Sequence, residues 1–476
     1  MDVVTRPSFV APPSHLSINS AAMLFSLPSS LPYFPRARGL HALGLLVGAL
    51  LLLPSSTQAQ KQPGMQGPFA LTNAEVITAP GDTIANGTVV IRDDSIAAVG
   101  PNVAVPGDAN VIQGDGLTVL PGLIDSGTQL GLEEVGSLSE TQDYNEVGEL
   151  TANMDALTAV NPNSVSIPVT RVHGITTVLT EPTRGLLPGS AALISLHGYT
   201  PQQMHTGGVE LTKLDFPATG RSGPSDSRSP ETIEKEAEKA LNKLNDLWDE
   251  AERYAAIDSA VAVDPETRRQ PKYLPPMEGL IPVIRGEQPL LLAANTASDI
   301  SSALDWAGER DVLDQVILTE AAEGWRVADE IAAADVPVLV GPIMQPPSRE
   351  SDRYDKVYRN PALLHEAGVT VALRTGSAEN VRNLPFHAGF AAAHGLGKTE
   401  ALRAVTTTPA EIFGVADRVG TLEVGKRANL FVTDGDPFQP RTDIEHLFID
   451  GYKLPLESRH SKLYDEFLNR TPGLEK

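Results

Sequence analysis

The sequence predicts an α/β protein with two parts, a (β/α)8 barrel and a smaller β domain formed from both ends of the chain. Apolar strand-like runs alternate with helical segments through the middle, which favours parallel pairing with right-handed crossovers. Short β-like alternations broken by turn residues occur at both ends. The 476 residues, 41% of them hydrophobic, suffice for one barrel of roughly 250–350 residues plus a smaller domain.

The two ends of the chain predict short strands separated by turns. From Phe69 onwards apolar and polar residues alternate, and Asn86-Gly87 and Asp93-Asp94 stand where hairpins are expected to turn. A similar pattern returns near the C-terminus, where residues 429–433 (NLFVT) and 446–450 (HLFID) predict strands. We therefore expect the two ends to join in one small sheet domain.

The middle of the chain supplies the expected barrel. Its apolar runs, which predict strands, include VTRVHGITTVL, AALISLHG, PLLLAAN, QVILTEA, VPVLVGP and VTVALRTG. Helical stretches such as ISSALDWAGER lie between several of these runs. One insertion is distinct, because Ser229 as N-cap and Pro230 in the first turn predict a helix that runs to about Tyr254.

The N-terminal segment has the features of an export signal. Arg36 and Arg38 precede an apolar run over residues 40–53, and Thr57-Gln58-Ala59 gives small residues at the spacing of a signal-peptidase site. The alternative is a membrane anchor, but the run is shorter than the ~20 residues that a bilayer requires. We therefore predict cleavage after Ala59 and a periplasmic or secreted protein.

These features give a predicted organisation of the whole chain. Met23 is an alternative translation start that would give a signal of more ordinary length. The segments, in order, are a signal peptide (1–59), a linker (60–68), the first part of the β domain (69–118), the barrel (119–415), the second part of the β domain (416–458) and a C-terminal tail (459–476).

Composition excludes several kinds of partner and site. The formal net charge of −23 is spread along the chain, so its surface repels nucleic acid and anionic membranes, and we expect neither as a partner after signal cleavage. The chain has no cysteine, which excludes disulfides, thiolate metal sites and cysteine nucleophiles. A cysteine-free exported chain suits a bacterial periplasm.

Two long segments carry a resemblance to a known family. LTVLPGLIDSGTQLG (117–131) resembles the first barrel strand of the amidohydrolase superfamily, in its imidazolonepropionase-like branch, and ALRAVTTTPAEIFGVADRVGTLEVGKRANLFVTDGDPF (401–438) is similar to the closing segment of that family. The resemblance covers nearly all of residues 69–455. It implies a TIM-like (β/α)8 barrel with a small β-sandwich domain formed from the N- and C-terminal segments. It also implies a hydrolase that acts on non-peptide carbon–nitrogen bonds, normally with zinc or another divalent metal.

The sequence departs from the family where the metal ligands are expected. The family's first strand carries Asp-x-His-x-His, whereas residues 125–129 read Asp-Ser-Gly-Thr-Gln. The stretches around Ala293 and Thr319 lack the two later histidines, and Gly376 takes the place of the final aspartate. Glycine has no side chain to bind an ion, and a neutral amide oxygen is a poor ligand for a divalent metal. We therefore expect neither a catalytic metal nor another cofactor at the usual position.

Other polar residues at the strand ends are the remaining candidates. Strand periodicity places Asp125, Gly127 and Gln129 on one face, toward the barrel axis, and Arg374 inward on the last strand. We predict catalytic roles for Asp125, Gln129 and Arg374. Arg374 either pairs with Asp125 or Glu320, binds an anionic ligand, or merely fills the space. The carboxylates predicted to line a ligand pocket are Glu133, Glu181 and Glu320.

The histidines are weaker candidates, because none has partners at metal-ligand spacing. His173 and His197 are predicted at strand ends, and the residues expected in helices or loops are His365, His387 and His394. Three functions therefore compete: a metal-dependent hydrolase, a degenerate member that binds a ligand or supports a partner, and an enzyme with metal-independent chemistry. The expected partners are a small-molecule ligand and either further copies of the chain or an active paralogous subunit.

Overall fold

The computed structural model describes residues 64–220 and 227–470. The predicted signal peptide, residues 1–59, lies outside the described residues, as do residues 60–63 of the predicted linker. Within the described ranges no helix combines the length and the apolar character needed to cross a bilayer.

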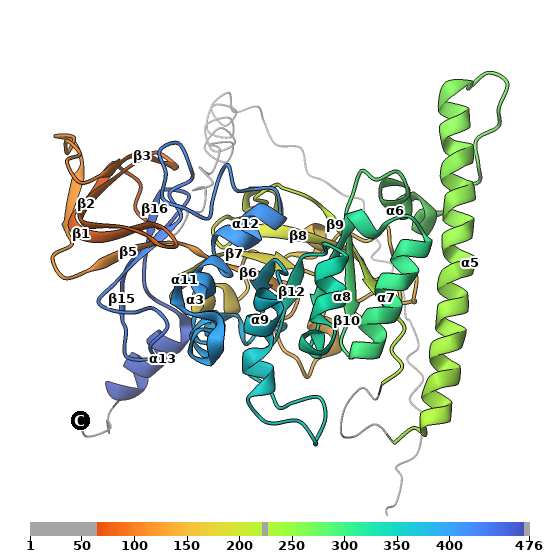
Figure 1. Ribbon diagram of the computed structural model, residues 1–476. Helices are drawn as coiled ribbons and strands as arrows, with labels where there is room; N and C mark the ends of the chain where they lie inside the picture. Colours follow the sequence, from red (N-terminus) through yellow and green to blue (C-terminus); the bar gives the residue numbers. More distant parts are fainter. Residues whose placement is uncertain (1–63, 221–226, 471–476) are drawn as a thin grey trace, which may run out of the picture. The chain divides into compact units, whose positions relative to one another are not determined.

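One sheet joins the two ends of the chain, as predicted. Its strands follow the order β16-β15-β14-β5-β1-β2-β3, and β4 pairs in parallel with β1. Figure 1 shows the N-terminal strands β1–β5 beside the C-terminal β15 and β16. That this sheet forms a sandwich stays a prediction. The strands are β1 (Phe69–Ala79), β2 (Asp82–Arg92), β3 (Ser95–Gly100), β4 (Asn110–Gln113), β5 (Thr118–Pro121), β14 (Leu430–Thr433), β15 (Ile444–Ile449) and β16 (Tyr452–Leu454).

The predicted turn at Asn86-Gly87 is wrong. Both residues lie inside β2, where the β1–β2 register shifts beside Gly87. A Cβ at Gly87 would lie 2.6 Å from Cγ2 of Val76, so glycine here permits a close approach of two strands rather than a turn. The other predicted turn is confirmed, because Asp93 and Asp94 connect β2 to β3 and Asp93 has a positive φ of 55°.

A second sheet of eight strands forms a nearly closed barrel in a mixed α/β fold. Its strands follow the order β13-β12-β11-β10-β9-β8-β7-β6. The two outermost strands approach each other, and the Gly376 N–H donates a hydrogen bond of 3.0 Å to the Gly127 carbonyl. The strands are β6 (Leu123–Thr128), β7 (Ile175–Thr180), β8 (Gly189–Ser195), β9 (Leu211–Asp215), β10 (Leu290–Ala294), β11 (Val316–Glu320), β12 (Val338–Val340) and β13 (Val371–Leu373).

One barrel strand departs from the expected parallel arrangement. β8 pairs antiparallel with both β7 and β9, whereas the other neighbouring pairs are parallel. The connection from β7 to β8 spans only residues 181–188, which is too short for the helical crossover that a parallel pair requires. The carboxyl end of β8 therefore lies at the opposite end of the barrel from the carboxyl ends of its neighbours.

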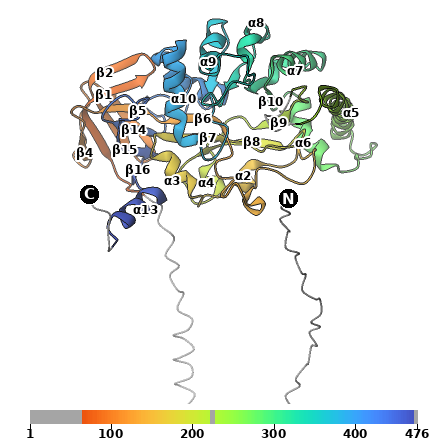
Figure 2. The same ribbon diagram turned by 90° about the horizontal axis from the view of Figure 1, so that it is seen from below.

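Helices cover the barrel and bury its outer face. In Figure 1, α7, α8 and α9 follow one another along one side, and Figure 2 shows the same helices after a quarter turn. The helices are α2 (Ala156–Ala159), α3 (Ser166–Arg171), α4 (Pro201–Met204), α5 (Pro230–Val263), α6 (Pro275–Ile284), α7 (Ala297–Glu309), α8 (Ala328–Ala333), α9 (Lys356–Glu366), α10 (Leu384–Ala391), α11 (Lys398–Arg403), α12 (Thr407–Ile412) and α13 (Arg459–Leu468).

The insertion after β9 forms the longest helix of the described chain. The Ser229 hydroxyl accepts a hydrogen bond of 3.2 Å from the Thr232 N–H, which confirms the predicted N-cap of α5. The helix continues to Val263, beyond the predicted end near Tyr254. Trp248 on α5 is fully buried and packs edge-on against Trp306 of α7, with ring centroids 5.0 Å apart. The helix is therefore fixed to the barrel by its apolar face.

The barrel interior is filled by side chains. Apolar residues from the strands, among them Ile124, Leu291 and Ile317, form one buried cluster with Phe413. A barrel of eight strands is a packed core and not a pore. Any site in this barrel must therefore be built at its ends.

Candidate functional site

The carboxyl ends of the barrel strands carry a cluster of charged side chains. In barrels of this type the loops after the strands form the functional face. Six charged residues from five strands or strand ends gather here, and we call them the mouth cluster. Its members are Asp125 (β6), Glu181 (after β7), Lys213 and Asp215 (β9), Glu320 (β11) and Arg374 (after β13).

Arg374 lies at the centre of the mouth cluster. Its guanidinium donates to the Thr319 hydroxyl through Nη1 and to the Glu181 carboxylate through Nη2, and its side chain is only 3% exposed. The sequence correctly predicts an inward-pointing side chain. The predicted pairing with Asp125 or Glu320 is wrong, because Glu181, which follows the strand beside β6, supplies the carboxylate instead.

The guanidinium of Arg374 occupies the space beside Gly127. A Cβ built at Gly127 would lie 2.8 Å from Cζ and 2.9 Å from Nε of Arg374. Carbon atoms at that separation overlap, so no larger side chain fits at position 127 while Arg374 stays in place. Position 127 is one of the two places where the resemblance implies a metal-binding histidine.

Glu181 is held by two cations. Its Oε1 atom accepts from Arg374 and lies 3.3 Å from Nζ of Lys213, and both Glu181 and Lys213 are at most 1% exposed. Burial opposes ionisation of Glu181, but Arg374 and Lys213 together hold its pKa below the ordinary value. Burial likewise opposes the charge of Lys213, but Glu181 and Asp215 raise its pKa above the ordinary value. All three groups are therefore charged at neutral pH.

Asp215 extends this chain of charges toward solvent. Its Oδ1 atom lies 3.6 Å from Nζ of Lys213, and its side chain is 27% exposed. Burial raises the pKa of Asp215 to about 6, while Lys213 acts in the opposite direction and the carboxylates of Glu320 and Glu181 add to the rise. The ionised form of Asp215 is therefore less well stabilised than that of Glu181.

Asp125 is buried below the rim of the barrel. It accepts hydrogen bonds from the Thr375 hydroxyl at 2.5 Å, the Thr375 N–H at 3.2 Å and the Gly127 N–H at 3.0 Å. Burial nevertheless raises the pKa of Asp125 to about 6, although the bonds from Thr375 and Gly127 lower it. A buried carboxyl group that titrates near neutral pH can take or release a proton.

The predicted alternation along β6 is wrong around this residue. The β6–β7 register shifts between Asp125 and Thr128, and the neighbouring Ile124 belongs to the apolar cluster inside the barrel. A bulge re-aims the side chains of a strand. Asp125, Gly127 and Gln129 therefore do not share one regular face.

The remaining predicted carboxylates and Gln129 have separate places. Gln129 lies just beyond β6 and is 8% exposed. Glu320 ends β11 with a positive φ of 73° and accepts a hydrogen bond from Nδ2 of Asn295. Glu133 is half-buried in the loop after β6, where burial and the charge of Glu379 raise its pKa. Glu133 thus lies outside the mouth cluster.

The structure places the predicted histidines on different elements. His173 precedes β7, because residues 166–171 form α3 rather than the predicted strand. His197 follows β8, whose antiparallel direction puts it at the opposite end of the barrel, and its ring packs 4.5 Å from that of Tyr452. His387 lies on α10, and burial lowers its pKa to about 4.

Sequence reasoning missed two members of the mouth cluster, Lys213 and Asp215. The segment LTKLD forms β9, so these residues, two positions apart, point to the same face. A lysine within an otherwise apolar strand was the available signal, because a buried lysine requires a partner. Thr375 was missed as well, since its contact with Asp125 joins residues 250 positions apart in the chain.

The donor chemistry of the mouth cluster does not match a divalent metal site. Within residues 64–220 and 227–470, no three histidine, aspartate or glutamate side chains gather closely enough to hold a metal ion. Glu181 is already neutralised by Arg374 and Lys213, and a fixed guanidinium repels a second cation. The expected absence of a metal stays a prediction.

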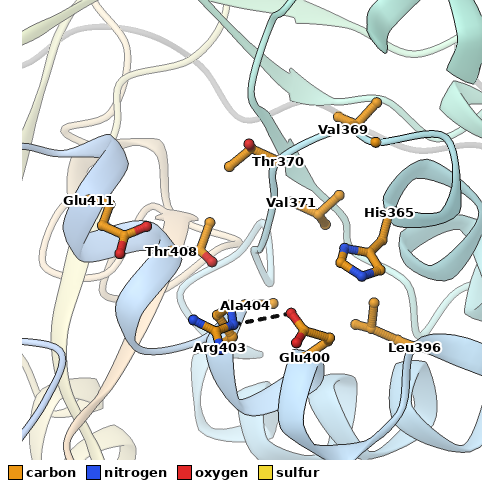
Figure 3. A pocket seen from close by; sticks show the side chains of 11 residues that line it. His365, Val369, Thr370, Val371, Leu396, Glu400, Arg403, Ala404, Thr408 and Glu411 are labelled. Carbon is orange, nitrogen blue, oxygen red and sulfur yellow. Dashed lines mark ion pairs between the residues drawn. The ribbon is translucent and has the colours of Figure 1, made fainter. Parts of the chain in front are cut away.

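Both of the described cavities lie away from the mouth cluster. One, of about 270 Å³, is lined by His365, Glu400 and Arg403 and by residues 368–371 at the beginning of β13 (Figure 3). Because β13 begins there, this cavity is near the opposite end of the barrel. The other, of about 240 Å³, lies between the end of α3 and residues 437–444.

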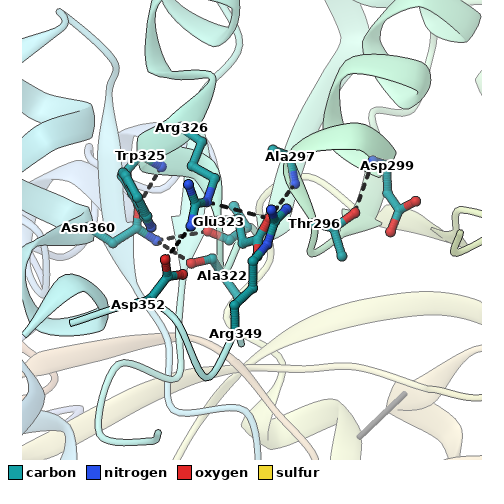
Figure 4. A network of polar contacts seen from close by, with 11 residues as sticks. Thr296, Ala297, Asp299, Ala322, Glu323, Trp325, Arg326, Arg349, Asp352 and Asn360 are labelled. Carbon is teal, nitrogen blue, oxygen red and sulfur yellow. Dashed lines mark hydrogen bonds and ion pairs between the residues drawn. The ribbon is translucent and has the colours of Figure 1, made fainter. Parts of the chain in front are cut away.

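Ion pairs hold the loop after β12 next to the mouth. Arg349 donates from Nε and Nη2 to the two carboxylate oxygens of Glu323, each at 2.6 Å (Figure 4). Glu323 is 2% exposed and also accepts from the Ala297 N–H at the start of α7. Arg326 bridges Glu323 to Asp352 of the same loop. The loop is therefore pinned to the ends of β10 and β11.

Known proteins share this fold. Residues 315–454 match the profile of the Amidohydrolase family. The structure is similar to an amidohydrolase from Thermotoga maritima, with 22% identity, 81% of this chain and 99% of that chain covered, and a TM-score of 0.70. It is also similar to a prolidase complexed with N-methylphosphonate-L-proline, with 15% identity, 82% and 99% coverage and a TM-score of 0.50. No curated protein sequence matches the chain. Residues 315–454 therefore resemble the Amidohydrolase family, and the described chain shares the fold of a solved amidohydrolase.

Proposed function

We propose that this chain is an amidohydrolase-type protein whose barrel binds a small polar molecule without the metal-dependent step of that family. The family's reaction, by resemblance to the imidazolonepropionase-like branch, is hydrolysis of a non-peptide carbon–nitrogen bond. In this chain the mouth cluster supplies fixed charges instead of metal ligands. A degenerate member that binds a ligand, or that supports an active paralogous subunit, fits these features best.

The guanidinium of Arg374 beside Gly127 carries the proposal. A hydrolytic metal needs several neutral or anionic donors that converge on one point. Here a buried cation fills that side of the barrel mouth and is tied to Glu181. Removing Glu181 would leave two buried cations without their shared carboxylate, and removing Arg374 would leave Glu181 with Lys213 alone; breaking a buried pair from one side costs about 3–5 kcal/mol. The arrangement therefore favours a permanent ion pair over an exchangeable metal.

A second candidate is metal-independent hydrolysis with Asp125 as general base. Asp125 is fully buried, and burial raises its pKa to about 6, which suits proton transfer near neutral pH. In this mechanism Asp125 would accept a proton from water, while Arg374 would stabilise negative charge on the substrate oxygen. The hydrogen bonds from Thr375 would keep the carboxylate in one orientation.

The cellular location, the ligand and the partners of the protein are part of the same proposal. The signal-like segment before Gln60 favours a periplasmic or secreted protein. The expected ligand is a small molecule, because the acidic surface disfavours nucleic acid and anionic membranes. Further copies of the chain or an active paralogue are the expected protein partners.

Elemental analysis and turnover assays on the same purified chain test the proposal. We expect less than one tightly bound zinc per chain, and no hydrolysis of a panel of cyclic amides and N-acyl compounds with or without chelator. Chelator-resistant hydrolysis that Asp125→Asn abolishes would support the second candidate. Chelator-sensitive hydrolysis with one zinc per chain would refute both. Arg92→Met, at a surface ion pair with Asp108, is the control for nonspecific loss of an arginine.

A further inference from the structure

The last helix of the described chain, α13, is well formed but buries none of its residues. It begins with a capping box, in which the Ser458 hydroxyl accepts from the Ser461 N–H at 3.2 Å and the Ser458 N–H donates to the Ser461 hydroxyl at 2.9 Å. No residue of Arg459–Leu468 is buried. Figure 1 shows α13 next to the C-terminal end of the chain. The helix thus has defined ends and exposed sides.

One side of α13 is apolar and open. His460, Leu463, Tyr464 and Phe467 follow the spacing i, i+3, i+4, i+7, which places them on one face of a helix. Leu463 is 38% exposed, Tyr464 65% and Phe467 49%. Ser461 and Leu468, the partly exposed residues of α13, lie about 90° around the helix from the centre of this face, so that flank of the helix faces the body of the protein. The apolar face therefore points outward.

The charges of α13 run against the helix dipole. Arg459 and Lys462 stand in the first turns, Asp465 and Glu466 in the last, and the first turn has no acidic residue. A helix is stabilised by negative charge near its start and positive charge near its end. This charge pattern therefore destabilises α13 as an isolated helix. A contact of these charges with opposite charges outside the helix would offset that cost.

We propose that α13 pairs with α13 of a second copy of this chain, in antiparallel orientation across a twofold axis. Arg459 and Glu466 are seven residues apart and so occupy the same position in two successive heptads, two helical turns apart. In an antiparallel pair, Arg459 of one helix faces Glu466 of the other, and the symmetry repeats this contact. The reversed charges that disfavour one helix alone are complementary in the pair. The proposal is independent of the proposed function.

The contacts that Arg459 and Glu466 make within the chain leave both side chains able to bind a second copy. Arg459 makes no ion pair within residues 64–220 and 227–470. Glu466 pairs with Arg470 at 2.7 Å, but both side chains are more than half exposed, so exchanging that partner costs little. Ten residues give a helix about 15 Å long. Such a small contact predicts weak association, with a dissociation constant in the micromolar range.

Sedimentation velocity with the full chain and charge-swapped variants tests the pairing. We expect the unaltered chain to dimerise between about 1 and 100 µM, the range of weak complexes. Arg459→Glu or Glu466→Arg alone should raise the dissociation constant about tenfold or more. The double variant Arg459→Glu/Glu466→Arg should restore it, because the pair is rebuilt in reverse. Lys462→Glu, whose side chain pairs with Glu457 in the same chain, is the matched control.

Several outcomes would overturn the proposal. A monomer at all concentrations would do so, as would a dimer that neither single charge reversal weakens, or one that the double variant fails to restore. Phe467→Ser adds a test that does not depend on charge, and it should weaken the dimer while circular dichroism shows an unchanged fold. Binding of α13 to phosphatidylcholine vesicles, abolished by Phe467→Ser in a chain that stays monomeric, would replace the proposed partner with a membrane surface.

Discussion

Replacing Arg374 by methionine tests the energetics of the mouth cluster most directly. Methionine keeps most of the buried volume but removes one of the two cations that hold the Glu181 carboxylate, and Lys213 is the other. Glu181 is fully buried, and its Oε2 atom has no hydrogen-bond partner among the described residues. Breaking a buried ion pair from one side costs about 3–5 kcal/mol. At roughly 2 °C per kcal/mol for a large domain, the melting temperature should fall by about 6–10 °C.

The loss in the Arg374→Met variant should depend on pH in a defined direction. In the unaltered protein Arg374 and Lys213 outweigh burial, so the pKa of Glu181 is below its ordinary value of 4.5. This carboxylate therefore adds stability above pH 4.5 that is lost only as the pH falls through the lowered pKa. In the variant only Lys213 still opposes the effect of burial, so we expect a higher pKa of Glu181 than in the unaltered protein, and protonation of Glu181 then relieves the destabilisation as the pH falls. The difference between the two proteins should shrink from pH 7 to pH 5.

Thermal unfolding followed by circular dichroism at pH 5 and pH 7 measures both effects. The double variant Arg374→Met/Glu181→Gln should lose less stability than the sum of the two single variants, because it removes one charge of each sign while Lys213 keeps Asp215. Arg92→Met is the control, since its exposed pair with Asp108 is screened by solvent and should contribute little to stability. An Arg374→Met loss no larger than that of the control, or one that does not change with pH, would refute the reasoning.

Three further predictions concern neighbouring features. Gly127→Ala should lower the free energy of unfolding by about 1–3 kcal/mol, because its Cβ would lie 2.8 Å from Cζ of Arg374. The double variant Gly127→Ala/Arg374→Met should lose less stability than the two single variants added together. Strictly additive losses would contradict the contact. Burial raises the pKa of Asp215 from 3.8 to about 6, so the contribution of this group to stability falls as the pH rises from 3.8 to about 6. Asp215→Asn should therefore raise the melting temperature at pH 7 but not at pH 4. An equal effect at both pH values would contradict this. Glu323→Gln should speed proteolysis of the loop that Arg349 anchors; unchanged cleavage at that loop, mapped by mass spectrometry, would count against the anchoring role.

The sequence predicts those parts of the fold that follow from local patterns. Turn residues and alternating apolar residues identify the strands of the end sheet, and Ser229-Pro230 identifies the start of α5. The inward direction of Arg374 and the position of Glu181 at the rim follow from the ends of strand-like runs. Each of these features depends on residues close together in the chain.

The features that could not be predicted depend on pairing between distant segments. The run that forms β8 has no residue that specifies its direction, and only the short connection from β7 makes it antiparallel. Arg374 pairs with Glu181, 193 positions away in the chain, and the register of β6 shifts next to Asp125, the partner expected from the sequence. Whether a strand is bulged is decided by its neighbours in the sheet, which the linear pattern does not contain.

The contact between Arg374 and Gly127 has a consequence for anyone who would install a metal in this barrel. Introducing histidine at position 127 alone drives an imidazole into the guanidinium. Deleting Arg374 alone leaves the buried carboxylate of Glu181 with Lys213 as its remaining cation. Neutralising Glu181 alone would in turn leave the guanidinium of Arg374 buried without its carboxylate, so a workable route must change Arg374 and Glu181 together and only afterwards add the ligand. The order of substitutions, and not only their identity, decides whether intermediates along that route fold.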